Sequence, residues 1–168
     1  MGIKEYEQTL VSPLKEATVL LLQRDCEVLL AMKKRGFGAG KWNGVGGKPN
    51  PGEEINETAV RETKEEIDVT PLDPQKVAVF KYYFPHDDFG MQVWVFTAKE
   101  WEGEPSESEE MKPQWFSLKD IPYDQMWSDD KVWMPKVFEG KKLTGSFMFD
   151  KDGNVTEYYM DEVGVIEE

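Results

Sequence analysis

Apolar residues in this chain come mostly in short runs that polar turns separate, which is the pattern of β-strands. The runs at 18–22 and 28–32 flank a polar turn at Arg24-Asp25 and therefore predict a hairpin of buried strands. Further strands are predicted at 77–84, 91–98, 114–118, 144–149 and 155–160, the last two joined by a turn at Asp152-Gly153.

Helical spacing of apolar residues occurs in two segments. The first predicted helix begins near residues 54–56 and ends around Ile67. The second covers 129–138, with Ser128 as its N-cap and two aspartates in its first turn. The remaining segments are predicted as a weakly structured extension at 1–15, a glycine-rich loop and tight strand at 35–48, a proline-containing loop at 71–74, an acidic loop at 103–111 and a short helical turn at 119–125.

Strands in mixed order, with one helix after the third strand and another near the end, predict an α/β sandwich. We expect a curved mixed β-sheet that lies between helices. At 168 residues the chain fits one domain, which we place at 16–168 after the extension at 1–15.

The composition of the chain excludes several classes of function and partner. A formal net charge of −13 disfavours a protein that grips polymeric nucleic acid, whereas a small phosphorylated ligand that carries its own metal is compatible with it. One cysteine, Cys26, cannot form an internal disulfide, and no signal peptide or membrane-spanning run is present. We therefore expect a cytoplasmic monomer without a membrane or nucleic-acid partner.

This chain has too few histidine and cysteine residues for catalysis by histidine or by zinc. The single histidine, His86, lies in a polar stretch between two predicted strands and is interpreted as a turn residue. Zinc sites and Ser-His-Asp chemistry need more histidine and cysteine than this. Any catalysis must therefore use carboxylates and a metal.

Three glutamates supply such carboxylates. Glu62, Glu65 and Glu66 stand at i, i+3 and i+4, so they share one face of the first predicted helix. Like charges this close repel, and a hard cation with oxygen ligands, Mg²⁺ or alternatively Mn²⁺, would relieve the repulsion. The alternative is a solvated helix face with charge pairs such as Arg61 with Glu65.

The spacing of these residues resembles the signature of the Nudix hydrolase family. Five residues separate Gly47 from Glu53, seven more precede Arg61-Glu62, and Glu65-Glu66 follow after two. Two positions depart from the family pattern, since Thr63 replaces an aliphatic residue and Asp68 replaces a glycine. Thr63 can still pack on the buried stripe with its hydroxyl bonded to the preceding turn, and Asp68 can adopt the left-handed conformation that ends a helix.

The resemblance implies the Nudix α/β/α sandwich and assigns roles to residues. Arg61 would pair with Glu53 or a helix carboxylate to fix the geometry. The general base stays open among Glu65, Glu66 and Glu110. The implied metal site comprises Gly46, Glu62, Glu65, Glu66 and Glu110, and the implied catalytic group adds Glu53 and Arg61.

Segments outside this signature, at 32–48, 108–116, 121–130 and 145–150, resemble the MutT-class branch of the family that hydrolyses oxidised purine nucleoside triphosphates in animals. The resemblance runs from about residue 18 to 163. It implies a base site that comprises Thr18, Lys33, Phe37, Asn43, Tyr82, Phe84, Met91, Trp127, Asp129 and Asp130. Tyr82 stands where the matched pattern has phenylalanine, and Val45 also replaces a phenylalanine.

These residue types suit a purine. Trp127 and Phe37 can supply a flat apolar wall, and Asn43 can both donate and accept hydrogen bonds. Two adjacent carboxyl groups, Asp129 and Asp130, can share a proton, so the pair could match more than one oxidised base. The alternatives are ordinary core packing for the aromatic residues and helix N-terminal charge for the aspartates.

The sequence thus predicts a Mg²⁺-dependent pyrophosphohydrolase that converts a small-molecule nucleotide substrate, an oxidised purine nucleoside triphosphate, to monophosphate and pyrophosphate. A second hypothesis keeps the metal centre but changes the substrate to a dinucleoside polyphosphate, a methylated purine nucleotide or an RNA 5′ end. A third is a ligand sensor without catalysis.

Overall fold

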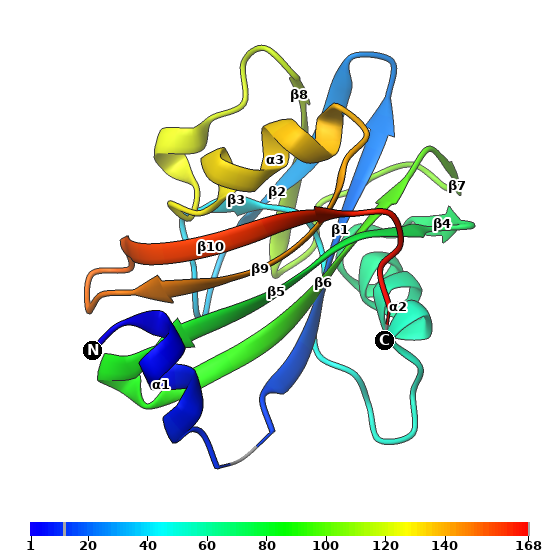
Figure 1. The fold of residues 1–168 in the computed structure, drawn as a ribbon. Helices are drawn as coiled ribbons and strands as arrows, with labels where there is room; N and C mark the ends of the chain where they lie inside the picture. The colour runs from blue at the N-terminus through cyan, green and yellow to red at the C-terminus, as the bar shows by residue number, and fades with distance from the viewer. Residues whose placement is uncertain (12, 168) are drawn as a thin grey trace.

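A computed structural model describes residues 1–11 and 13–167 (Figure 1). Within these residues the strands form one eight-stranded mixed sheet and one two-stranded sheet. The large sheet has the order β10-β9-β5-β6-β1-β2-β3, and β8 also pairs with β2. Its strands are β1 (Lys15–Arg24), β2 (Glu27–Lys33), β3 (Trp42–Asn43), β5 (Gln75–Phe84), β6 (Phe89–Ala98), β8 (Met111–Ser117), β9 (Lys142–Phe149) and β10 (Val155–Val163).

The predicted hairpins and the mixed sheet are confirmed. Strand β1 pairs antiparallel with β2, and β9 pairs antiparallel with β10. Two neighbouring pairs, β1 with β6 and β5 with β9, are parallel. Helix α2 (Ile55–Ile67) and helix α3 (Asp130–Phe138) lie on opposite sides of the large sheet (Figure 1). The arrangement is the predicted α/β/α sandwich.

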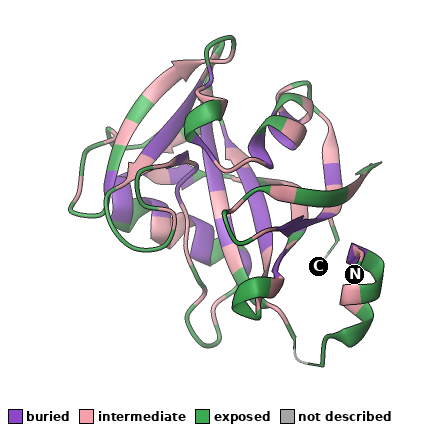
Figure 2. Ribbon diagram, turned by 90° about the vertical axis from the view of Figure 1, so that its left-hand side faces the viewer, coloured by how far each residue is buried: buried purple, intermediate pink, exposed green. Residues whose placement is uncertain are grey.

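Alternation along β1 shows why the sheet is covered on both faces. Leu20 and Leu22 belong to the hydrophobic cluster that includes Ile67 of α2, whereas Leu21 belongs to the cluster that includes Trp133 of α3. Because successive side chains of a strand point to opposite faces, these leucines bury both sides of the sheet. The buried residues accordingly follow the central strands in Figure 2.

The prediction of weak structure at the N-terminus is wrong for residues 3–9, which form helix α1 (Ile3–Thr9). Ile3 is buried and packs in a cluster with Tyr83 and Met148. The Glu7 carboxylate accepts hydrogen bonds from the Tyr83 hydroxyl at 2.6 Å and from the Tyr159 hydroxyl at 3.0 Å. These contacts come from strands far along the chain. The division between an extension at 1–15 and a domain at 16–168 stays a prediction.

Three smaller predictions are corrected. The loop predicted at 71–74 begins with strand β4 (Thr70–Leu72), which pairs with β7 (Glu100–Glu102). Strand β8 begins at Met111 because its pairing with β2 extends to Lys33. The N-cap of α3 is Asp129, and Ser128 instead accepts a hydrogen bond from the backbone N–H of Val155 at 2.9 Å.

The short helical elements match their predicted places. The 3₁₀ turn η2 (Tyr123–Gln125) lies within the predicted helical turn, and η1 (Pro85–Asp87) contains His86 as a turn residue. Across residues 1–11 and 13–167, each helix falls short of the length and apolar character that a membrane crossing needs.

Candidate active site

Helix α2 presents the three glutamates, and local interactions fix its two ends. Glu54 and Glu57 form a reciprocal capping box at the N-terminus, with the Glu54 backbone N–H donating to the Glu57 carboxylate at 3.1 Å. Asp68 ends the helix in the left-handed conformation, with φ of 60°, as predicted. Thr63 is fully buried and its hydroxyl donates to the Ala59 carbonyl at 2.8 Å, which is also the predicted contact.

Two glycines bring backbone against this helix. The Thr18 backbone N–H donates to the Gly47 carbonyl at 2.8 Å, and the Gly47 N–H donates to the Thr18 hydroxyl at 3.2 Å. A Cβ on Gly46 would lie 1.8 Å from the Thr18 carbonyl oxygen, and one on Gly47 would lie 2.4 Å from the Glu62 carboxyl carbon. The Thr18 backbone therefore excludes any side chain at Gly46, whereas a side chain at Gly47 would displace the Glu62 carboxylate, so the chain packs directly beside a site carboxylate.

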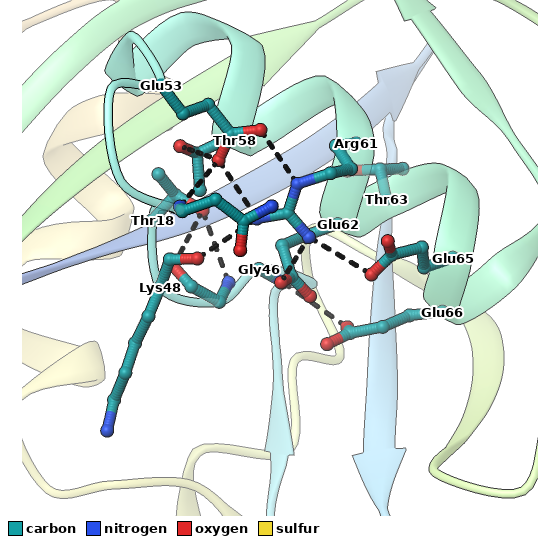
Figure 3. Close-up of polar contacts among 12 residues, drawn as sticks. Thr18, Gly46, Lys48, Glu53, Thr58, Arg61, Glu62, Thr63, Glu65 and Glu66 are labelled. Carbon is teal, nitrogen blue, oxygen red and sulfur yellow. Dashed lines mark hydrogen bonds and ion pairs between the residues drawn. The ribbon is translucent and has the colours of Figure 1, made fainter.

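Arg61 lies at the centre of a carboxylate network (Figure 3). Its Nε and Nη2 atoms donate to the two oxygens of Glu53, at 2.7 and 2.9 Å. Its Nη1 donates to Glu62 at 2.9 Å and to Glu65 at 3.1 Å. The planar guanidinium fixes several carboxylates at once, which a lysine could not do.

The Glu53–Arg61 pair also explains the charge state of Glu53. The Arg61 guanidinium, assisted by the Thr58 hydroxyl at 2.7 Å, lowers the pKa of Glu53 to about 2. The Glu53 carboxylate in turn raises the pKa of Arg61 further above its usual range. This pair is therefore fully charged at neutral pH, and its bidentate form holds the loop before α2 against the helix.

Glu66 has the opposite environment. Its side chain points toward the Gly46 segment (Figure 3), and the residue is only 6% exposed. Burial, followed by the nearby charge of Glu62, raises the pKa of Glu66 to about 8. The Gly46 backbone N–H opposes this shift, since it donates to the Glu66 carboxylate at 3.4 Å. Glu66 is thus a carboxyl group that exchanges a proton close to neutral pH.

A cavity of about 220 Å³ joins the helix carboxylates to the acidic loop. Glu110 lies in its wall, where Arg35 donates to it at 3.4 Å. The predicted metal residues Glu62, Glu65, Glu66 and Glu110 therefore share one cavity. The full lining is Arg35, Glu62, Glu65, Glu66, Ser108, Glu109 and Glu110.

The donor set fits a hard divalent cation. Four carboxylates with no sulfur and no imidazole suit oxygen-preferring ions, and the buried Glu66 needs a positive partner to ionise without penalty. Among the described residues, no three acidic, histidine or cysteine side chains already converge as a ligand set. Arg61 holds Glu62 and Glu65 in this arrangement, so these two carboxylates would have to turn from it toward a cation.

Five of the predicted base-site residues form an aromatic and acidic group on the α3 side of the sheet. The Phe37 ring lies 5.2 Å from that of Trp127 and 5.8 Å from that of Phe84, measured between centroids. Phe37 is 56% exposed, which leaves this aromatic wall open to a ligand. Tyr82 joins the group through Asp129, to which its hydroxyl donates at 2.7 Å.

The two adjacent aspartates are both 3% exposed. Burial raises the pKa of Asp129, and burial together with the charge of Asp129 raises the pKa of Asp130 much further. The Oδ2 atom of Asp130 is buried without a hydrogen-bond partner. Because buried polar atoms are almost always paired, this atom is a candidate contact for a ligand.

The remaining predicted residues lie around these two groups. Thr18 is bonded to Gly47 and so belongs to the glycine segment beside α2. Lys33 lies close enough to Glu66 to favour its ionised form. Asn43 accepts a hydrogen bond from the Gly44 N–H at 2.8 Å, and Met91 packs against the core cluster of α3.

The sequence did not identify two side chains that contact the aromatic and acidic group around Trp127 and Asp129. Trp133 donates its indole N–H to the Oδ2 atom of Asp129 at 2.9 Å, and the Lys41 ammonium lies 5.2 Å from the Trp127 ring centroid. The i, i+4 spacing of Asp129 and Trp133 in a predicted helix is the signal that could have identified the first.

Comparisons with known proteins identify the family of the chain. A model of the NUDIX domain matches residues 13–137. An oxidized purine nucleoside triphosphate hydrolase from Danio rerio is 45% identical over 149 residues, which cover 89% of this chain and 96% of that protein. A protein of the same name from Mus musculus is 42% identical over 146 residues, which cover 87% of this chain and 94% of that protein.

The fold is also similar to solved structures. The crystal structure of a MutT protein from Bacillus halodurans matches with a TM-score of 0.79 and 29% identity. The match covers 88% of this chain and 98% of that one. The similarity thus extends over most of the chain.

Proposed function

The chain belongs to the Nudix family, and we propose that it is a Mg²⁺-dependent pyrophosphohydrolase of oxidised purine nucleoside triphosphates. Nudix hydrolases use divalent cations to act on phosphoanhydrides, and the carboxylate site beside Gly46 and Gly47 suits such an ion. The products would be a nucleoside monophosphate and pyrophosphate. The expected biological role is removal of damaged precursors from the nucleotide pool.

One observation carries this proposal: Glu62 and Glu65, which Arg61 holds, line one cavity with the buried Glu66, while an open aromatic wall with two buried aspartates lies on the α3 side. The first arrangement supports hydrolysis and the second supports recognition of a base. The Danio rerio and Mus musculus proteins, which align over most of the chain, carry names that state the same substrate class.

The residues divide the chemistry among them. Glu62, Glu65, Glu66 and Glu110, with the Gly46 backbone, would hold a divalent cation, whose positive charge would stabilise negative charge on the phosphate oxygens. The Arg61–Glu53 pair holds the loop before α2 against the helix, and Lys33 adds a positive charge near Glu66. Water attacks phosphorus, the bond to the pyrophosphate leaving group breaks, and one carboxylate takes the proton of the water.

Glu66 lies in the cavity wall beside Gly46, where a bound cation together with Lys33 would favour its ionised form, so it suits the role of proton acceptor. Glu65 and Glu110 remain alternatives. Glu65 is mostly exposed and paired with Arg61, and Glu110 is paired with Arg35, so each would have to leave a positive partner to act.

Steady-state rates across a nucleotide panel test the proposal. We expect kcat/KM for 8-oxo-dGTP or 2-oxo-dATP to exceed that for dGTP by about tenfold or more, the effect of one or two well-placed hydrogen bonds. The panel also includes a methylated purine nucleotide, a dinucleoside polyphosphate and a capped RNA 5′ end. Preference for one of these three would overturn the assigned substrate class while leaving the hydrolase intact.

Glutamine variants test catalysis against mere ligand binding. Glu66→Gln should bind nucleotide but lose most turnover, because the carboxylate is required for metal binding and proton transfer. Glu57→Gln is the matched control on the same helix, since glutamine can keep the capping box that Glu57 makes with Glu54. Equal turnover by the two variants would contradict the assigned site.

Two further expectations from the sequence stay predictions, namely the monomeric state and the cytoplasmic location. Cys26 is an exposed free thiol, which is compatible with a reducing compartment.

A further inference from the structure

Two hydrogen-bond donors converge on one oxygen of Asp129. The Tyr82 hydroxyl lies 2.7 Å and the Trp133 indole nitrogen 2.9 Å from the Oδ2 atom of this residue. An indole N–H can only donate, so Oδ2 is an acceptor in this contact. Tyrosine at position 82 is a departure from the matched sequence pattern, which has phenylalanine there. The Tyr82 hydroxyl, the second donor to Asp129 beside Trp133, is therefore a departure of this chain from that pattern.

The neighbouring aspartate has weaker support, namely one backbone hydrogen bond at Trp127, whose effect on its pKa is smaller than those of burial and of the Asp129 charge. Asp130 is equally buried, and its Oδ2 atom has no hydrogen-bond partner. Two buried carboxylates side by side cannot both ionise cheaply, so one proton is shared between them. Two donors stabilise the charged form of Asp129, whereas the unpartnered oxygen of Asp130 favours its protonated form. The pKa of Asp130 is also raised more than the pKa of Asp129, which agrees with a proton on Asp130.

Other titratable groups that face the pair do not reverse this order. Burial and the Asp130 charge raise the pKa of Tyr123 of η2, so this phenol stays neutral and adds no charge beside the pair. Lys41 favours ionised Asp130, but its effect is smaller than those of burial and of Asp129. Tyr82 itself stays protonated, because burial and the Asp129 charge raise its pKa well above the usual value.

We propose that Tyr82 is a positioning residue for base selection: it keeps Asp129 as the acceptor and Asp130 as the donor of a hydrogen bond to the base. The inference rests on the proposed function. An Asp130 O–H can donate to a carbonyl oxygen or an unprotonated ring nitrogen, but not to an amino group. 8-Oxoguanine and 2-oxoadenine carry their carbonyl and amino groups in opposite order around the ring. A fixed donor therefore fits one base better than the other, and phenylalanine at position 82 would let the proton move to fit both.

The variant Tyr82→Phe tests this inference, with Tyr83→Phe as the matched control. Tyr83 is the next residue of β5, and its hydroxyl bonds to Glu7 of α1 instead. We expect the ratio of kcat/KM between the two oxidised nucleotides to move toward one by about tenfold in Tyr82→Phe, the effect of removing a hydrogen bond to a charged group. Tyr83→Phe should leave the ratio unchanged. A ratio in Tyr82→Phe within about twofold of the wild-type value would overturn the inference.

A second measurement does not depend on activity. Carboxyl ¹³C NMR titration of the free protein should show a higher midpoint for Asp129 in Tyr82→Phe than in wild type, with no change in Tyr83→Phe. An unchanged Asp129 midpoint in Tyr82→Phe would also refute the assignment. If the wild type hydrolysed neither oxidised nucleotide faster than dGTP, the proposed function would fail, and this titration would still decide the role of Tyr82.

Discussion

Glu66 gives the sharpest test of the site, because its burial makes a stability prediction without any substrate. The pKa of Glu66 is about 8 in the folded protein, against an ordinary value of 4.5. A group whose folded pKa is raised keeps its proton in the native state while the unfolded chain loses it. In protein free of divalent cations, Glu66 therefore destabilises the fold increasingly from about pH 4.5 to about pH 8.

The magnitude follows from linkage. Each pH unit in this window costs about 1.4 kcal/mol of unfolding free energy, so the full window sets a ceiling on the order of 5 kcal/mol. Glutamine has a similar shape and does not titrate. The variant Glu66→Gln should therefore gain stability relative to the wild type as pH rises through the window, and the gain should level off above about pH 8.

Urea unfolding in the presence of a chelator, at several pH values between about 5 and about 9, measures this difference. Glu65→Gln is the control for loss of a charge from the same helix, since Glu65 has a side chain that is 57% exposed. Added Mg²⁺ should stabilise the wild type and not Glu66→Gln. A difference between wild type and Glu66→Gln that stays constant across pH would refute the view that Glu66 is held in a desolvated site.

Two further substitutions probe other parts of the molecule. Gly47→Ala should lower kcat/KM by about 100-fold while costing about 1 to 3 kcal/mol of stability, because the added methyl group displaces the Glu62 carboxylate. Gly164→Ala, where a Cβ meets nothing within 4 Å, is its control, and equal kinetics for the two would contradict the close approach. Ile3→Ala should cost about 2 kcal/mol in thermal or urea unfolding with KM unchanged, because α1 docks through this side chain. An unchanged unfolding midpoint would mean that α1 does not contribute to stability.

Local sequence signals predicted the parts of the fold that local interactions determine. The ends of α2 were predicted nearly to the residue, because the carboxylates, Thr63 and Asp68 all act within a few turns of one helix. Helix α1 was not predicted. Its only buried residue is Ile3, and the partners that stabilise it, Tyr83 and Met148, belong to strands far along the chain.

At the site, too, the sequence predicted local contacts but not contacts between distant segments. The pairing of Arg61 with Glu53 was among the predicted contacts, and it depends on a short loop that returns to its own helix. The contact between Tyr82 and Asp129 joins residues 47 positions apart, so only the folded sheet reveals it. Sequence alone identified both residues as candidates but could not show that a hydrogen bond joins them.

The order of strands in the large sheet limits where the chain can be shortened. The region that matches the family ends at residue 137, yet β9 lies beyond it and pairs along β5. A protein truncated there would leave β5 with unpaired backbone groups along one side and would also lose the stacking of Phe149 on Phe84, 4.7 Å between centroids. The smallest piece worth producing for biochemistry or for drug screening therefore extends through the final hairpin.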